Sequence, residues 1–311
     1  MYGKSTGLWE DFKMELNSGN IISRLILINV IVFLLANIIN VFAFLLSEEK
    51  SAAGLFLSNI LKWVMLPADL MQLLYRPWTL ITHMFTHFGF FHLLFNMLWL
   101  YWFGRILSEF VGQKKILPLY IMGGLAGAIL LIASYNIFPG LQSSVPYVQA
   151  LGASAGVLAI VVGAATLVPD YSVHLLFLGS VRIKYIALVL VLIDLISIPQ
   201  ANTGGHIAHL GGAVFGYLFV RQMQTGNDWS IPFNNLMDKI SGVFSSLSRL
   251  RKPRVVYKNP KSSTVKSSSA KKDSKNRQER VDEILDKISS SGYDSLTAEE
   301  KAFLFQVSKE E

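Results

Sequence analysis

Long apolar stretches alternate with short polar ones along the first 220 residues. A membrane-spanning helix needs about 20 mostly apolar residues, and six stretches have this character. They comprise residues 21–46, 79–103, 116–138, 151–168, 185–198 and 205–220. The pattern therefore predicts six spanning helices. A further apolar stretch, residues 54–75, is interrupted by Lys62, Pro67 and Asp69, and we expect it to form an interfacial loop that lies on or dips into the bilayer.

Composition supports an all-α integral membrane protein. Of the 311 residues, 52% are hydrophobic and only 16% are charged, which is far too apolar for an ordinary soluble domain. The chain has no cysteine, so a disulfide framework, a thiolate metal site and a cysteine nucleophile are all excluded. The first apolar stretch is longer than a signal-peptide core and no small-residue cleavage site follows it, so we expect it to be retained.

Basic residues in the short loops predict the orientation in the membrane. They occur in two of these loops, with Arg105, Lys114 and Lys115 in the first and Arg182 and Lys184 in the second. Residues 136–150 and 199–205 hold none. Because cytoplasmic loops carry the excess of Lys and Arg, both termini are predicted to face the cytoplasm.

The composition changes after the last apolar stretch. Residues 249–280 hold twelve Lys or Arg against two acids, with many serines, which is typical of a disordered segment. We therefore divide the chain into an N-terminal segment (1–20), a six-helix domain (21–223), a basic linker (224–280) and a terminal module (281–311). The linker is expected to contact anionic lipid. No aromatic or groove-reading pattern accompanies its charge, so we do not expect it to bind nucleic acid.

The terminal module regains signals of order. Apolar residues at helical spacing are followed by Gly292, which breaks the run, and Thr297 with Glu300 forms a capping-box pattern ahead of a second apolar run. These features predict a small module of two helices in the cytoplasm. We expect it to bind a partner protein.

A Gly-x-Ser-x-Gly motif, Gly152-Ala153-Ser154-Ala155-Gly156, lies within the fourth apolar stretch. Small residues four apart are common in spanning helices because they let backbones approach closely, and a serine there often bonds a nearby carbonyl. A soluble α/β-hydrolase elbow would need a strand before the motif and a sheet around it, and helix-length stretches flank it instead. The motif alone leaves packing and nucleophilic catalysis open.

A histidine in the sixth stretch gives Ser154 a candidate base. His209 precedes Gly212 by three residues and Gly216 by seven, so all three share the helix face that can pack most closely. A histidine that only packs is the alternative. An ionisable group within a membrane helix is costly, however, and is a functional candidate by default; a serine on the neighbouring helix is the partner that a general base needs.

Distances along the helices place the polar groups at one depth. At about 1.5 Å per residue, Ser154 lies roughly 24 Å from Asp170, His209 roughly 18 Å from Arg221, and His92 roughly 20 Å from Arg105. These depths correspond to the outer half of the bilayer. A water-filled cavity that opens outward could therefore reach the serine.

The second stretch adds hydrogen-bond donors. His92 and Asn96 are four residues apart and share a helix face, so together with the Ser154 N–H they are candidates to stabilise an oxyanion. His83 and His87 extend the same side. Their spacing suits zinc, but the stretch has neither HExxH nor a nearby carboxylate, so we expect loop anchoring and no metal.

These motifs resemble those of the rhomboid intramembrane serine proteases over about residues 21–223. The resemblance implies a six-helix bundle, a Ser154–His209 dyad without a third acid, an oxyanion hole lined by His92 and Asn96, and a mobile fifth helix and cap loop that admit substrate. It places His206 at the cavity rim rather than at the base position. It rests on Gly152, Ser154, Gly156, His92, Asn96, Ala208, His209, Gly212 and Gly216.

Two positions depart from the family pattern. Members often have Trp-Arg ahead of the second span, whereas here Thr79 follows Trp78 and Arg76 precedes it. Many members place a tyrosine one turn after the nucleophile, where it stacks on the imidazole, and this chain has Leu158. We therefore expect a different loop anchoring and a different orientation of His209.

The sequence thus predicts a serine endopeptidase that cuts spanning helices of membrane proteins near the outer face, without a cofactor. Its expected partners are these substrates and membrane lipids. The resemblance suggests a bacterial plasma membrane. The alternative is a catalytically silent relative that binds membrane helices as a scaffold, which retention of Ser154 and His209 disfavours. A transporter is disfavoured because the chain shows no inverted repeat and, apart from Asp194, its intramembrane polar residues gather in one layer.

Overall fold

A computed structural model describes residues 19–46, 59–175, 179–249 and 268–309. The chain divides into two compact units, Met1–Leu247 and Ser248–Glu311. The predicted N-terminal segment lies almost entirely outside the described residues. Each unit is considered by itself below.

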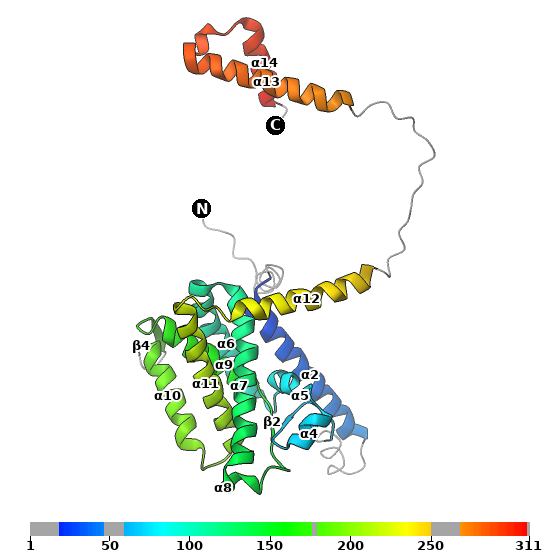
Figure 1. The fold of residues 1–311 in the computed structure, drawn as a ribbon, viewed down its shortest axis with the longest axis vertical. Helices are drawn as coiled ribbons and strands as arrows, with labels where there is room; N and C mark the ends of the chain where they lie inside the picture. The colour runs from blue at the N-terminus through cyan, green and yellow to red at the C-terminus, as the bar shows by residue number, and fades with distance from the viewer. Residues whose placement is uncertain (1–18, 47–58, 176–178, 250–267, 310–311) are drawn as a thin grey trace, which may run out of the picture. The chain divides into compact units, whose positions relative to one another are not determined.

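Six helices form the main body of the first unit, one for each predicted apolar stretch (Figure 1). They are α2 (Ile21–Leu46), α6 (Phe90–Val111), α7 (Ile116–Ile137), α9 (Ser154–Leu167), α10 (Ile183–Ser197) and α11 (Thr203–Gln224). The second stretch was predicted too long at its start. Residues 79–89 form the short helix α5 (Thr79–Thr82), the 3-10 turn η1 (His83–Phe85) and a turn that ends at Gly89, whose φ of 101° separates it from α6.

Among the described residues, three helices are long and apolar enough to cross a membrane. They are α2, α6, and α7 together with the 3-10 turn η2 (Gln113–Lys115) before it. The fourth stretch forms the apolar but shorter helix α9, of 14 residues. The all-α prediction is confirmed in this coarser form, as a mostly helical protein with three candidate spans.

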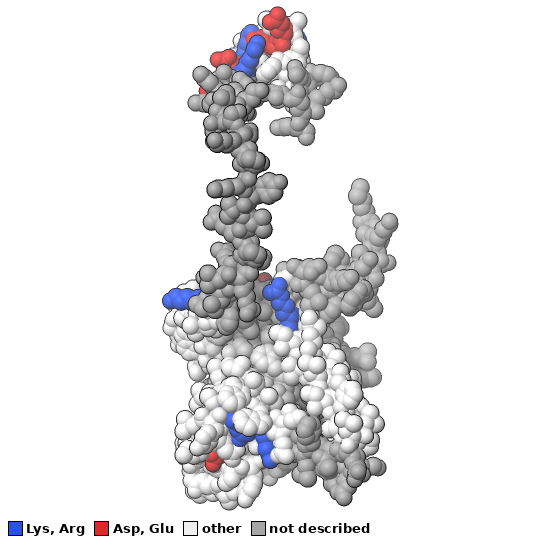
Figure 2. All heavy atoms as spheres, turned by 90° about the vertical axis from the view of Figure 1, so that its right-hand side faces the viewer, with Lys and Arg blue, Asp and Glu red and all other residues white. Residues whose placement is uncertain are grey.

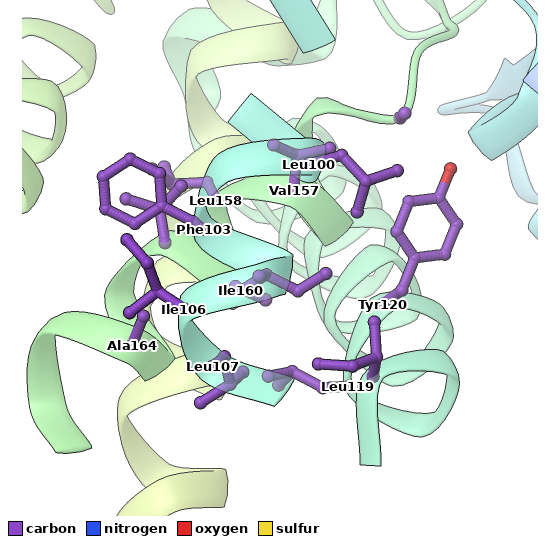
Figure 3. Packing of buried hydrophobic residues seen from close by; sticks show 14 of the residues in the cluster. Leu100, Phe103, Ile106, Leu107, Leu119, Tyr120, Val157, Leu158, Ile160 and Ala164 are labelled. Atoms are coloured by element: carbon purple, nitrogen blue, oxygen red, sulfur yellow. The ribbon is translucent and has the colours of Figure 1, made fainter. Parts of the chain in front are cut away.

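The core of the first unit lies around α9. This helix contacts α6, α7, α10 and α11, and most of its side chains are buried. Figure 3 shows Phe103 and Leu107 from α6, Leu119 and Tyr120 from α7, and Ile160 from α9 within the same apolar cluster. Because α9 is surrounded by other helices, Ser154 at its start has a rigid support.

Two short antiparallel sheets complete the unit. In the first, β1 (Leu66–Pro67) pairs with β2 (Gln149–Ala150), which lies just before the Gly-x-Ser-x-Gly motif. In the second, β3 (Ser172–Leu175) pairs with β4 (Gly179–Arg182) ahead of α10. The first sheet therefore connects the predicted interfacial loop, which also contains α4 (Leu70–Tyr75), to the segment that carries Ser154. Residues 54–58 of that loop are outside the described part of the chain.

The outer surface of the helices is apolar. Many large hydrophobic side chains of α2 and α10 are more than half exposed, among them Leu35, Phe42, Leu188 and Ile196. On the face shown in Figure 2, the described part of the helical body carries few charged side chains. An apolar exterior of this extent suits a lipid environment.

Trp78 and Arg76, the two residues that depart from the family pattern in sequence, both anchor the loop before α5. The indole of Trp78 stacks on that of Trp63, with ring centroids 6.1 Å apart, and donates its Nε1–H to the Trp63 carbonyl at 2.7 Å. The Arg76 guanidinium lies over the Trp63 ring and donates to the carbonyl of Lys62. Both residues therefore hold the same loop even though their order along the chain is reversed.

The disorder predicted for residues 249–280 is wrong for residues 268–280, and the segment assigned as a linker, residues 224–280, also contains a helix nearer its start. Residues 230–249 form the helix α12 (Ser230–Arg249) and residues 268–280 belong to α13 (Ser268–Ser291). Lys115 forms an ion pair with Asp228 at 2.9 Å just before α12, and Asn234 on α12 donates to the Lys114 carbonyl at 3.1 Å. The remaining linker residues, 250–267, lie outside the described chain.

The second unit contains the two helices predicted for the terminal module, although α13 begins earlier than expected. Gly292, with a φ of 79°, ends α13, and the turn η3 (Tyr293–Ser295) leads into α14 (Ala298–Lys309). The capping box is confirmed: Thr297 N–H donates to Glu300 Oε2 at 2.7 Å, and Glu300 N–H donates to Thr297 Oγ at 3.3 Å.

Candidate active site

Ser154 is the first residue of α9, where backbone N–H groups have no partner within the helix. The preceding Gly152 has a φ of 126°, a conformation that residues with a side chain rarely adopt. A Cβ on Gly152 would also lie 2.9 Å from Cε1 of His92. Glycine is therefore required at this position both for the turn into α9 and for the close approach of the His92 ring.

Two histidines hold the segment before Ser154, as the sequence predicted for them. The Gly152 N–H donates to the carbonyl of His83 at 2.8 Å, and the Ala153 N–H donates to Nε2 of His87 at 3.3 Å. The His83 ring in turn contacts the Thr79 carbonyl through Nδ1, at 2.7 Å. Both side chains are buried. The loop before α6 thus fixes the position of the serine.

His209 faces Ser154 because α11 packs closely on α9. A Cβ on Gly212 would overlap the carbonyl oxygen of Ala155, and a Cβ on Gly216 would overlap that of Ala159. Only glycine permits this separation of the two helices. The close-packing face that the sequence predicted for α11 is therefore present, and it carries His209.

The two predicted partners lie in direct contact. Nε2 of His209 is 2.6 Å from Oγ of Ser154, which is within hydrogen-bond range for a nucleophile and its base. His209 is partly buried. The structure therefore brings together the serine from α9 and the histidine from α11, which are 55 residues apart in the sequence.

Asp194, which the sequence set apart from the layer of polar residues, lies next to the His209 imidazole. Oδ1 of Asp194, on α10, is 2.8 Å from Nδ1 of His209 and 2.8 Å from Nδ1 of His206. The resemblance implied a dyad without a third acid, whereas the structure places this carboxylate within hydrogen-bond distance of the imidazole. A carboxylate only accepts hydrogen bonds, so both Nδ1 atoms donate, and the neutral His209 ring is left with Nε2 as an acceptor for the Ser154 hydroxyl.

A cavity of about 190 Å³ opens beside this group. It lies among α6, α9, α10 and α11 and combines the polar groups with apolar walls. Its lining consists of Asn96, Trp99, Ser154, Val157, Leu158, Val161, Leu190, Ile193, Asp194 and His209. A small, mostly apolar pocket with a few convergent polar groups is typical of a binding site.

His92 and Asn96, the residues predicted to line an oxyanion hole, lie close to Ser154. Asn96 is buried, lines the cavity, and donates from Nδ2 to the carbonyl of His92 at 2.8 Å. The His92 ring meets that of His87 edge-on, with centroids 5.1 Å apart, and lies against Gly152. Both side chains therefore border the space next to Ser154.

One group among the described residues has ligand atoms close enough to hold a metal ion. It consists of Asp194, His206 and His209, whose atoms lie within 4.8 Å of one another. It is distinct from the His83 and His87 pair that the sequence brought into consideration. A metal there would replace both hydrogen bonds to Asp194. A His209 ring bound through Nδ1 would carry its hydrogen on Nε2, so it could not act as a base for Ser154.

Residues 75–223 match the family model described as the Rhomboid domain. This match and the relatives described below identify residues 75–223 as a rhomboid domain. Residues 270–310, which contain α14 and most of α13, match a family of unknown function, DUF6576.

The chain is similar to several named rhomboid proteins. It is 29% identical to RHOMBOID-like protein 12, mitochondrial, of Arabidopsis thaliana (49% of this chain, 48% of that protein). It is 26% identical to the human Presenilin-associated rhomboid-like protein, mitochondrial (68% and 52%), and 24% identical to Rhomboid protease GlpG of Yersinia pseudotuberculosis (51% and 52%). The chain spans about half the length of these relatives.

Proposed function

We propose that this chain is an intramembrane serine endopeptidase that cleaves membrane proteins near the outer face of the bilayer. The observation that carries the proposal is the 2.6 Å contact between Oγ of Ser154 and Nε2 of His209, at the wall of a cavity that is otherwise mostly apolar. Membership in a family that includes a protein named as a protease adds support.

The reaction is acyl transfer. Nε2 of His209 takes the hydroxyl proton of Ser154 while Oγ forms a bond to a peptide carbonyl carbon of the substrate. The C–N bond then breaks and His209 delivers the proton to the leaving amine. Water attacks the resulting ester, with His209 again as the base, and the free serine is restored.

Negative charge develops on the carbonyl oxygen during each attack. His92 and Asn96 lie beside the space next to Ser154 and are the donors proposed to stabilise it. The Ser154 N–H, at the positive end of α9, is the third. Such prearranged donors usually supply one of the largest contributions to catalysis of acyl transfer.

The proposed setting is a multi-pass membrane protein with six crossings and both termini in the cytoplasm. α9 is shorter than a full span and is enclosed by other helices, so Ser154 lies below the membrane surface and water reaches it through an outward-facing cavity. The relatives named above include mitochondrial and bacterial proteins. They do not favour the predicted bacterial plasma membrane over an organelle membrane.

The proposed substrates are proteins with a spanning helix that unwinds near its outer end. A hydrogen-bonded helix hides its carbonyl groups from the nucleophile, so small or helix-breaking residues are expected near the cut site. Lipids contact the apolar exterior. The proposed steps use no cofactor, and the terminal module is assigned to binding of a cytoplasmic protein.

Labelling with a fluorophosphonate, which reacts with activated serines, tests the proposal. The detergent-purified wild type should be labelled, and Ser154→Ala and His209→Ala should not. Ser134→Ala, which changes a buried serine of α7 away from the cavity, is the matched control and should be labelled like the wild type. Each variant is compared only after its thermal unfolding shows that it is folded.

The scaffold alternative gives a different result. A protein that only binds membrane helices would leave the probe unreacted in a folded wild type, or would be labelled equally in Ser154→Ala. Either outcome would remove the peptidase assignment.

A further inference from the structure

We propose that Asp194 positions the catalytic histidine, and that His206 holds Asp194 in place by sharing the same carboxylate oxygen. The active site would then be a Ser154–His209–Asp194 triad completed by α10 rather than a dyad. This inference rests on the proposed function, because His209 must act as a base for its orientation to matter.

The first support is the geometry of the carboxylate. Asp194 is buried, with 7% of its surface exposed, and is the only acidic residue of α10. Its Oδ1 accepts from Nδ1 of His209 and from Nδ1 of His206, each at 2.8 Å. A buried carboxylate is costly unless it is paired. The two imidazole donors offset the cost of burying this one.

The bond to Asp194 fixes the chemistry of the other ring nitrogen. With its hydrogen on Nδ1, the neutral His209 ring presents a lone pair on Nε2, which lies 2.6 Å from Oγ of Ser154. The opposite tautomer would put a hydrogen on Nε2, which could not then take the serine proton. Asp194 thus selects the tautomer that the reaction needs.

The environment of His209 shows why such a partner is needed. Leu158, one turn after Ser154, lines the cavity beside the imidazole and offers neither a hydrogen bond nor an aromatic face. Gly212, one turn along α11 from His209, has no side chain to restrain the ring. A hydrogen bond from α10 supplies a restraint that neither of these positions provides.

His206 supplies the second contact. It precedes His209 by three residues on α11, and the two rings meet edge-on with centroids 6.0 Å apart. Because both rings donate to one oxygen, the carboxylate is held from two directions. His206 therefore acts through Asp194 and is a positioning residue, as Asp194 is for His209.

The attachment of α10 makes this link sensitive to the position of that helix. Three residues of α10 are buried, Ile183, Ala187 and Asp194, and their spacing of four and seven places them on one face. Asp194 is the last of the three and the polar one. A shift of this end of α10 away from α11 would break the bond to His209 before any other part of the catalytic group moved.

The direct test is ¹⁵N NMR of the imidazoles in the full-length wild-type protein in detergent micelles above neutral pH, with the His209 signals assigned by their loss in His209→Ala. The proposal predicts a hydrogen on Nδ1 and an unprotonated Nε2. A hydrogen on Nε2 of His209 would overturn it, whatever the behaviour of the variants.

Kinetics of Asp194→Asn provide the second test, with a single-span test protein that has glycine and proline near its outer end as substrate. The variant should lower kcat by up to about 10⁴-fold, the loss seen when a triad acid is replaced by its amide, and change KM less than twofold. Asp194→Glu, which keeps the carboxylate, should recover part of the loss. Leu195→Ala, at an exposed position of α10, should behave like the wild type.

The outcomes separate the two proposals. If Ser154→Ala and His209→Ala are inactive and Asp194→Asn keeps kcat within twofold of the wild type, the positioning role is wrong and the peptidase stands. If Ser154→Ala remains active, the proposed function itself fails. An equal fall for Asp194→Asn and Asp194→Glu, with unchanged thermal unfolding, would also contradict the positioning role, because the carboxylate would then not be what matters.

Discussion

The carbonyl oxygen of Ala155 lies where a side chain on Gly212 would begin. Ala155 follows the serine directly, and Gly212 lies one turn from His209. The distance between the Ser154 and His209 side chains is therefore set by a backbone contact between α9 and α11. Rotation of either side chain could not compensate for a change in this contact.

Gly212→Ala should separate the two helices. The added methyl group overlaps backbone rather than a flexible side chain, so we expect a loss of about 1–3 kcal/mol in the free energy of unfolding and slower fluorophosphonate labelling of Ser154. Thermal unfolding in detergent and the labelling rate measure the two effects. Gly140→Ala, where no atom lies within 4 Å of the added Cβ, is the control. Wild-type behaviour of Gly212→Ala would contradict the packing argument.

His87→Phe should slow the labelling of Ser154 while the fold is kept. The change preserves an aromatic ring but removes the acceptor for the Ala153 N–H, and an unsatisfied buried donor costs about 1–3 kcal/mol. If this free energy is lost from the state in which Ser154 is correctly positioned, the labelling rate drops by about 5- to 150-fold. His174→Phe, at an exposed position of β3, controls for the loss of a histidine. Unchanged labelling in His87→Phe would show that the loop does not depend on this bond.

The effect of His206→Ala should depend on Asp194. If His206 acts only by holding the carboxylate, its replacement lowers kcat in the wild type by a smaller factor than Asp194→Asn does. It should have little further effect when Asp194 is already asparagine, because coupled residues are not additive. Measurement of kcat for the wild type, the two single variants and the double variant gives a double-mutant cycle that tests this. Multiplicative losses would mean that the two residues act independently.

The second unit should lose part of its stability in acid. The hydrogen bond from Lys287, followed by the one from the Thr297 N–H, lowers the pKa of Glu300 from 4.5 to about 2. Because this pKa is lower in the folded module than in the unfolded chain, the stabilisation is complete above about pH 4.5 and is lost as the pH falls toward 2. Hydrogen exchange of residues 296–304 in the full chain should therefore speed up over this interval relative to Glu300→Gln. Equal pH profiles in the two proteins would contradict the assignment.

The six main helices of the first unit could be predicted because each is encoded by local apolar composition. The same holds for the packing of α11 on α9, since Gly212 and Gly216 lie on the face that carries His209. The start of the second stretch was placed wrongly because residues 79–89 are as apolar as a span. The path of these residues is set instead by the turn at Gly89 and by the hydrogen bonds that His83 and His87 accept from the segment before Ser154.

Composition was a poor guide after the last span. Ser, Asn and Pro lower the overall apolar content of residues 230–249, yet Phe233, Leu236 and Ile240 recur at spacings of three and four, and the segment forms α12. Periodicity was informative where average composition was not. Periodicity does not explain the early start of α13, because residues 268–280 are rich in Lys and Ser and hold one apolar residue, Ala270.

Asp194 was missed because its partners lie on another helix. The depth measurement applied to the other spans would have indicated it: Asp194 follows Lys184 by ten residues, roughly 15 Å along a helix, close to the depth of His209. Depth alone does not show which side of α10 faces α11, however. That orientation follows from tertiary packing, which the sequence pattern of an apolar helix does not encode.

Cleavage of a spanning substrate by the purified protein in proteoliposomes is the most direct test of the central claim. With the glycine- and proline-containing single-span test protein as substrate, wild type should produce two fragments cut near the outer end of the substrate helix. Ser154→Ala, folded and present at the same density, should produce none. Equal cleavage by both proteins, or intact substrate with a folded wild type that binds it, would contradict a serine peptidase centred on Ser154 and His209.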